Sequence, residues 1–118
     1  MAGARGEGYL DLDGETYAVL FTNRAIAEAE KATGKGILQL LNGFRNDTTG
    51  VIDLVQLLAV GLEAARREGR SRAGGYNIND AWRLLDQLGF ATVAEVVFGA
   101  LADVMSYRPK RETSDPPA

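Results

Sequence analysis

The 118-residue chain contains no cysteine and no histidine. The absence of cysteine excludes a disulfide framework, a thiolate metal site and a cysteine nucleophile. The absence of histidine removes the commonest general base and the commonest metal ligand. No serine stands in a nucleophile-elbow setting, and no local motif supplies a pair of carboxylates for acid–base chemistry. We therefore expect a protein that is not an enzyme and that binds no metal and no cofactor.

Long apolar runs and an excess of positive charge are also missing. No stretch reaches the roughly 20 apolar residues that a membrane-spanning helix needs, and the N-terminus lacks the pattern of a signal peptide. The net charge is −3 and the pI is near 4.9, which is unfavourable for contacts with nucleic-acid phosphates. We expect a soluble, cytoplasmic protein of one domain that binds neither membrane nor nucleic acid.

The strongest pattern in the chain is an amphipathic helix at residues 51–65. Apolar side chains recur there with the period of an α-helix and fall on one stripe. The stripe consists of Val51, Leu54, Val55, Leu58, Leu62 and Ala65. Because so much apolar surface has to be covered, this helix is expected to lie at the centre of the fold.

Residues 8–21 predict a β-hairpin. Two alternating runs flank an Asp-Gly dipeptide at residues 13–14, which tolerates the positive φ values of a type I′ turn. A two-residue turn pairs Leu12 with Glu15. The core face is then expected to hold Leu10, Leu12, Tyr17, Val19 and Phe21. The opposite face, with Tyr9 and Leu20, is expected to point away from the core.

Helical periodicity and capping residues predict four further helices. With the central one, helices are expected at residues 24–33, 37–44, 51–67, 79–88 and 93–107. Gly34 and Gly89 end the first and fourth helices, and Thr92 with Glu95 forms a capping box for the fifth. The fold class is mostly α, a small domain of about five helices with an N-terminal β-hairpin. Residues 8–107 form the domain, between a flexible N-terminus (1–7) and a disordered tail (108–118).

Several local patterns resemble functional motifs but lack an essential part. A calcium loop at residues 9–20 would need acidic residues at both ends, where the chain has Tyr9 and Leu20. The Gly-Lys pair at residues 34–35 follows a helix rather than a strand, unlike a phosphate-binding loop. A helix-turn-helix at residues 79–107 would have an apolar start to its recognition helix. The basic cluster of Arg66, Arg67, Arg70 and Arg72 could contact nucleic acid or an acidic partner, but no aromatic residue is interleaved, and a helix C-terminus explains Arg66 and Arg67 without a ligand.

Exposed apolar residues are the more useful lead. For five apolar side chains, the predicted core offers no evident cover. They are our candidate partner-binding residues: Tyr9, Leu20, Val60, Phe98 and Met105. An apolar patch on a soluble protein indicates a protein partner or self-association. The alternative is that the short elements cover one another more completely than a helical wheel indicates.

The order of these elements resembles a known family. The residues that carry the resemblance are Leu-Asp-Leu-Asp-Gly-Glu-Thr-Tyr at 10–17, Ala-Ile-Ala-Glu-Ala-Glu at 25–30 and Ala-Trp-Arg-Leu-Leu-Asp-Gln-Leu-Gly at 81–89. They are similar to the tail assembly chaperones of long-tailed phages and to the related small proteins of gene transfer agent clusters. The similarity spans roughly residues 10–105.

The resemblance implies a non-enzymatic role during phage or prophage assembly in the host cytoplasm. Its implied partners are the tape measure protein, which such proteins keep soluble, and the tail tube protein, whose subunits they help to recruit. No motif of the family marks binding residues. The alternative is another small phage or prophage structural protein, a connector or tail-completion subunit, that assembles with further copies of itself into a ring.

Overall fold

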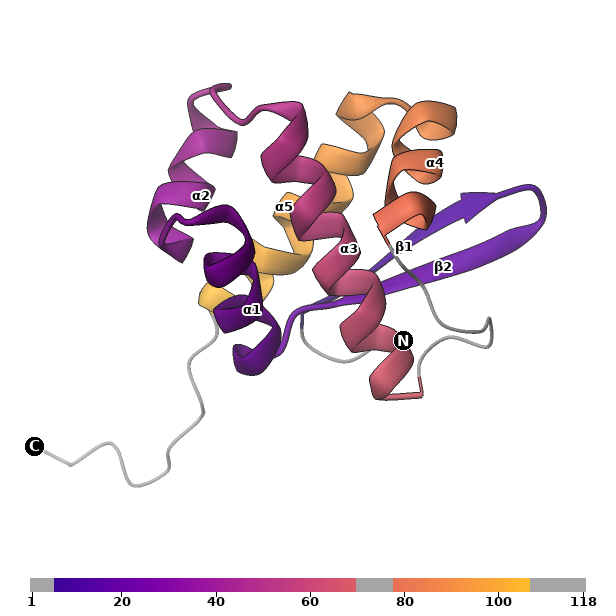
Figure 1. Ribbon diagram of the computed structural model, residues 1–118, viewed down its shortest axis with the longest axis horizontal. Coiled ribbons are helices and arrows are strands. Elements are labelled where there is room, and N and C mark those ends of the chain that lie inside the picture. The colour runs from indigo at the N-terminus through magenta and orange to yellow at the C-terminus, as the bar shows by residue number, and fades with distance from the viewer. Residues whose placement is uncertain (1–5, 70–77, 107–118) are drawn as a thin grey trace, which may run out of the picture.

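The computed structural model describes residues 6–69 and 78–106, which form a hairpin followed by five helices (Figure 1). This confirms the predicted mostly α fold. The elements are β1 (Glu7–Leu12), β2 (Glu15–Leu20), α1 (Asn23–Thr33), α2 (Ile37–Arg45), α3 (Val51–Arg67), α4 (Ile78–Leu88) and α5 (Phe90–Met105). The tail predicted at 108–118, and most of the flexible N-terminus predicted at 1–7, lie outside the described residues.

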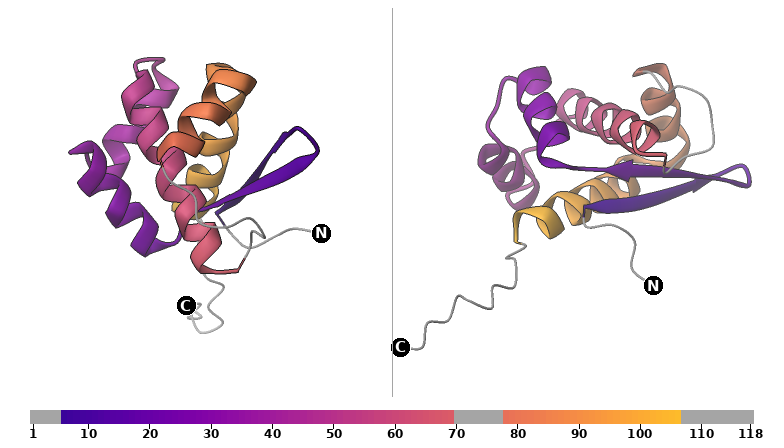
Figure 2. Two further views of the ribbon diagram at one scale, coloured as in Figure 1. Left: turned by 45° about the vertical axis from the view of Figure 1, so that its right-hand side comes forward. Right: turned by 90° about the horizontal axis from the view of Figure 1, so that it is seen from below.

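The hairpin has the predicted turn and register. β1 and β2 are antiparallel, with Leu12 opposite Glu15 and Leu10 opposite Tyr17. Asp13 and Gly14 have φ values of 54° and 78°, as a two-residue turn of type I′ requires. The hairpin lies between α3 and α5, and its turn projects beyond them (Figure 2).

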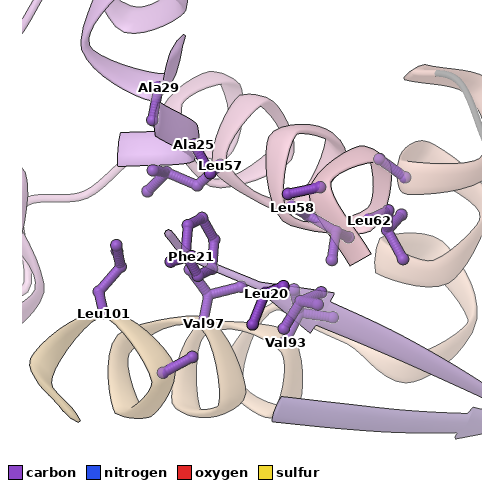
Figure 3. Packing of buried hydrophobic residues seen from close by; sticks show 14 of the residues in the cluster. Leu20, Phe21, Ala25, Ala29, Leu57, Leu58, Leu62, Val93, Val97 and Leu101 are labelled. Carbon is purple, nitrogen blue, oxygen red and sulfur yellow. The ribbon is translucent and has the colours of Figure 1, made fainter. Parts of the chain in front are cut away.

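β2 is covered on both faces, which the alternation of its residues did not predict. All five residues from Tyr17 to Phe21 are buried. Figure 3 shows Phe21 directed toward α3, whereas Leu20 lies beside Val93 of α5. The expectation that Leu20 points away from the core was therefore wrong. A single strand between two helices buries both sets of alternating side chains, as in a fully covered sheet.

The predicted central helix is α3, and a glycine sets how closely β2 approaches it. α3 packs against β2, α1, α4 and α5. A Cβ atom added to Gly61 would lie 2.8 Å from Phe21 Cζ and 3.0 Å from Val19 Cβ. On the other side of the hairpin, a Cβ atom on Gly8 would lie 2.8 Å from Val96 Cγ1 of α5. The α3 backbone at Gly61 therefore lies directly on hairpin side chains, and the hairpin backbone at Gly8 lies directly on a side chain of α5.

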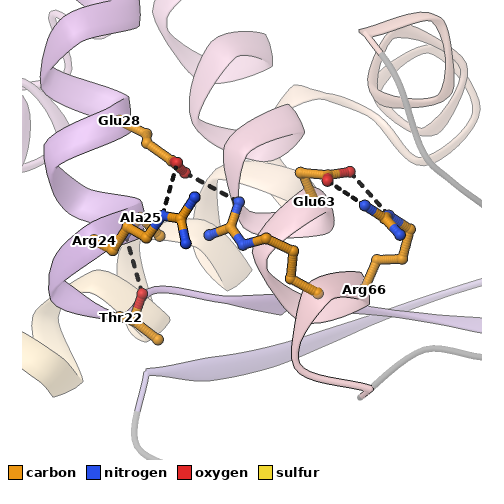
Figure 4. A network of polar contacts seen from close by, with 7 residues as sticks. Thr22, Arg24, Ala25, Glu28, Glu63 and Arg66 are labelled. Carbon is orange, nitrogen blue, oxygen red and sulfur yellow. Dashed lines mark hydrogen bonds and ion pairs between the residues drawn. The ribbon is translucent and has the colours of Figure 1, made fainter.

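The ends of α1 agree with the sequence signals. The Thr22 hydroxyl accepts a hydrogen bond from the backbone N–H of Ala25 at 3.1 Å (Figure 4), and Gly34 ends the helix at a φ of 74°. Arg67 on α3 reaches Glu28 at 3.4 Å and so connects the two helices. The expected α1 boundaries are confirmed to within one residue.

The corner between α4 and α5 differs from the prediction. Gly89 alone separates the two helices, and the direction of the chain bends by 120° between them. Its backbone, at φ 93° and ψ 151°, is open almost only to glycine, and its carbonyl accepts the first hydrogen bond of α5 from Val93 at 3.2 Å. α5 therefore begins at Phe90, and the capping box predicted at Thr92 is not used.

No single helix of the described residues is long and apolar enough to cross a membrane. Taken together, α4 and α5 have the length and apolar composition of a membrane span, but a bend of 120° separates them.

Gly6 connects the two ends of the described chain. Its N–H donates to the Asp103 carboxylate at 2.8 Å, and its carbonyl accepts from the N–H of Phe21 at 2.9 Å. Gly6 is buried at this position. The strand entering the hairpin is thereby attached to the last turn of α5.

The close approach at Gly61 predicts the effect of adding one methyl group. Gly61→Ala should lower the free energy of unfolding by about 1–3 kcal/mol, because overpacking against Phe21 outweighs the better helix propensity of alanine. The control is Gly99→Ala in α5, where a Cβ atom would meet nothing within 4 Å. That variant should gain up to about 1 kcal/mol. Chemical denaturation measures both, and a Gly61→Ala protein as stable as the wild type would contradict the packing described.

Candidate partner-binding surface

The five residues nominated from the sequence do not form one patch. Tyr9 on β1 and Met105 at the end of α5 are 50% and 40% exposed, respectively. Leu20 is only 2% exposed and cannot meet a partner. Val60 and Phe98 are partly buried against the core. That Tyr9, Val60, Phe98 and Met105 contact a partner stays a prediction.

Phe98 links α5 to α2. Its ring centroid lies 5.4 Å from that of Phe44, with the ring planes tilted by 44°, and the guanidinium carbon of Arg45 lies 5.9 Å from the Phe98 ring centroid. A helical wheel places Phe98 outside the main stripe of α5. α2 covers this second side of the helix, so a single helix pattern could not reveal the contact.

A cleft opens beside this aromatic pair. Its volume is about 140 Å³, and it lies between the end of α2, the loop before α3 and the first turns of α5. The lining residues are Gly43, Phe44, Asp47, Thr49, Phe90 and Ala94. A cavity of about 150 Å³ can hold a benzene ring, so this cleft has room for one bulky apolar side chain.

The spacing of three α5 residues explains why the cleft exists. Phe90, Ala94 and Phe98 are four residues apart and so lie along one side of the helix. The small Ala94, one turn after Phe90, leaves space between α5 and Phe44 of α2, and this space is the cleft. This spacing is visible in the sequence, but an α5 that starts at residue 93 leaves Phe90 out. Phe90 is 39% exposed.

The other side of the cleft is formed where α2 ends. The N–H of Thr48 donates to the carbonyl of Gly43 at 2.8 Å, and the N–H of Asp47 donates to that of Phe44 at 3.3 Å. Asp47 has a φ of 58°. This is the left-handed position after a helix that glycine usually occupies. Here an aspartate occupies the position at some cost in backbone strain. Its exposed side chain lies at the cleft.

A polar hollow adjoins the cleft, and exposed apolar residues follow its loop in the sequence. Val51 and Ile52, which begin α3 directly after the loop, are 46% and 69% exposed. A second hollow of about 90 Å³ shares Gly43 and Thr49 with the cleft. The Lys35 ammonium lines it and forms an ion pair of 2.8 Å with Asp53.

The groups with shifted pKa values lie elsewhere. A hydrogen bond from Arg66 lowers the pKa of the Glu63 carboxyl, and the same contact raises the pKa of Arg66 (Figure 4). Arg83 donates to the Tyr17 hydroxyl at 2.7 Å, and this bond raises the pKa of Arg83. Glu63, Arg66 and Arg83 are solvent-accessible partners in ordinary pairs, unlike a desolvated group in a cleft that performs acid–base catalysis.

An apolar cleft beside exposed apolar side chains is typical of a surface that contacts another protein. The chain belongs to the family described as "Phage tail tube protein, GTA-gp10", whose profile matches residues 5–106. Neither a curated protein nor a solved structure gives a significant match. The predicted relation to tail proteins of phages and gene transfer agents is thus confirmed, and the protein is a phage tail protein. Membership of a structural tail family favours a non-enzymatic role.

The packing of Phe98 predicts a stability effect. Phe98→Ser should lower the free energy of unfolding by about 1–3 kcal/mol, because it removes a half-buried ring and leaves Phe44 without its neighbour. Met105→Ser, at an exposed position, should change it by less than about 0.5 kcal/mol. Thermal or urea unfolding compares the two. If Phe98→Ser unfolds like the wild type, the ring is not needed for packing and its assignment as a contact residue gains weight.

The left-handed backbone of Asp47 predicts a stabilising substitution. Asp47→Gly should raise the free energy of unfolding by about 0.5–1 kcal/mol, because glycine adopts this conformation without strain. The matched control is Asn46→Gly, where φ is −100° and glycine only adds chain entropy to the unfolded state. Urea unfolding should rank Asp47→Gly above the wild type and Asn46→Gly below it. A loss of stability in Asp47→Gly would mean that the carboxylate itself holds the fold together.

Proposed function

We propose that this protein is a tail assembly chaperone that binds the tape measure protein and helps to recruit tail tube subunits around it. Membership of a phage tail family supports a role among tail components. The observation that carries the proposal is the apolar cleft lined by Phe44, Phe90 and Ala94. The exposed Val51 and Ile52 begin α3 two and three residues after Thr49, which also lines the cleft.

The physical requirements of such a chaperone match this surface. A tape measure protein is expected to present long apolar helical surfaces, which associate with one another unless they are covered. Helical partners are commonly held by apolar side chains inserted into grooves on an otherwise polar domain. A chain of net charge −3 with a cleft for one side chain can bind such a helix and remain dispersed in the host cytoplasm.

The second candidate is a self-assembling tail component that remains in the particle. The family description, which names a tail tube protein, is equally compatible with it. In that case the exposed apolar residues contact further copies of the chain, and the purified protein should form rings. A chaperone should instead bind a different protein and leave before the particle is complete.

Co-expression with the tape measure protein tests the proposal. The tagged chain should co-purify with the tape measure protein and raise its soluble fraction several-fold, because it covers apolar surface. Mass spectrometry of finished particles should detect tape measure protein but not this chain. Failure to co-purify, together with stoichiometric presence in particles, would favour the self-assembling component instead.

A further inference from the structure

We infer that the cleft binds a helical segment of its partner in which one large apolar residue is flanked, one turn away, by lysine or arginine. The inference deepens the proposed function, because it specifies which part of a tape measure protein would dock and where. It is based on the size of the cleft, on the Asp47 carboxylate that lines it and on the backbone of Asp47.

The size of the cleft limits the partner to one anchor. About 140 Å³ between Phe44, Phe90 and Ala94 accommodates a leucine or phenylalanine side chain and little else. Val51 and Ile52 add exposed apolar surface at the start of α3. A helix that inserts one anchor can therefore gain apolar contact along the turn that follows.

The negative charge at the cleft determines which partner residues can flank the apolar anchor. Asp47 lines the cleft and Glu95 follows Ala94 on α5, and both are exposed. Neither carboxylate has a hydrogen bond or ion pair with another described residue. The nearest cation along the chain, Arg45, contacts the Phe98 ring and the Asn42 side chain instead. The Asp47 carboxylate at an apolar hollow complements a basic residue adjacent to an apolar anchor.

The backbone of Asp47 is a separate indication that its carboxylate is used. Glycine would relieve the strain at φ 58°, and the described contacts hold no hydrogen bond or ion pair of the Asp47 carboxylate that would offset it. The other aspartate in this conformation, Asp13, occupies a hairpin turn, where Asp-Gly is a favoured sequence. Asp13 therefore provides a matched control at the far end of the hairpin.

Synthetic peptides of about 18 residues test the inference, since helices of this length have several turns. The first peptide carries one leucine anchor flanked by lysines, the second has glutamates in place of those lysines, and the third has alanine in place of the leucine. Each is labelled with fluorescein and titrated with the full-length protein, with anisotropy as the readout. The lysine peptide should bind at least about tenfold more tightly than the other two, and its advantage over the glutamate peptide should shrink between about 0.05 and about 0.3 M salt.

Variants locate the binding. Asp47→Asn keeps the shape and the left-handed backbone but removes the charge, so it should weaken the lysine peptide about three- to tenfold and leave the glutamate peptide unaffected or tighter. Ala94→Leu fills the cleft and should weaken the lysine peptide by at least about tenfold. Asp13→Asn and Leu38→Ser, at an exposed position at the start of α2, should bind like the wild type.

The outcomes separate this inference from the proposed function. Equal binding of the lysine and glutamate peptides, or wild-type affinity in both Asp47→Asn and Ala94→Leu, would overturn the inference. If the tape measure protein co-purifies equally well with these two variants, the chaperone role stands but uses another surface. If the peptides behave as expected while the tape measure protein fails to co-purify, the cleft is a docking site for a different protein.

Discussion

The fold depends on how closely the hairpin lies between α3 and α5. One strand, β2, supplies buried side chains to both helices, and glycines at Gly61 and Gly8 remove the atoms that would hold the backbones apart. Close packing on both sides makes the strand part of a core that no isolated two-stranded hairpin could form. The other helices are then arranged around α3, and their ends determine which surface remains open.

Local signals predicted the elements well, because each depends on neighbouring residues. The type I′ turn, the Thr22 cap and the Gly34 end of α1 follow from side-chain and backbone chemistry within a few positions. The errors concern contacts between distant segments. Leu20 is buried because α5 returns to the hairpin, and Phe98 is partly buried because α2 covers a second side of α5. No periodicity within one element contains that information.

The candidate surface was missed for a related reason. Gly89 was interpreted as the end of one helix, yet it also begins the next, so α5 includes Phe90. Asp47 lies between two predicted helices, and only its φ value reveals an unusual position. The small Ala94 acquires meaning once Phe44 is known to lie opposite. A cleft is the space left between side chains that are distant in the sequence. A pattern within one helix therefore cannot predict it.

The bond between Gly6 and Asp103 has a consequence for larger assemblies. It joins positions 97 residues apart and places both near the last turns of α5. Phe90 and the cleft lie at the first turns of the same helix, about 20 Å away along its axis at 1.5 Å per residue. A partner that binds at the cleft would therefore lie at the opposite end of α5 from this hydrogen bond. α5 thus holds the hairpin at one end and lines the cleft at the other.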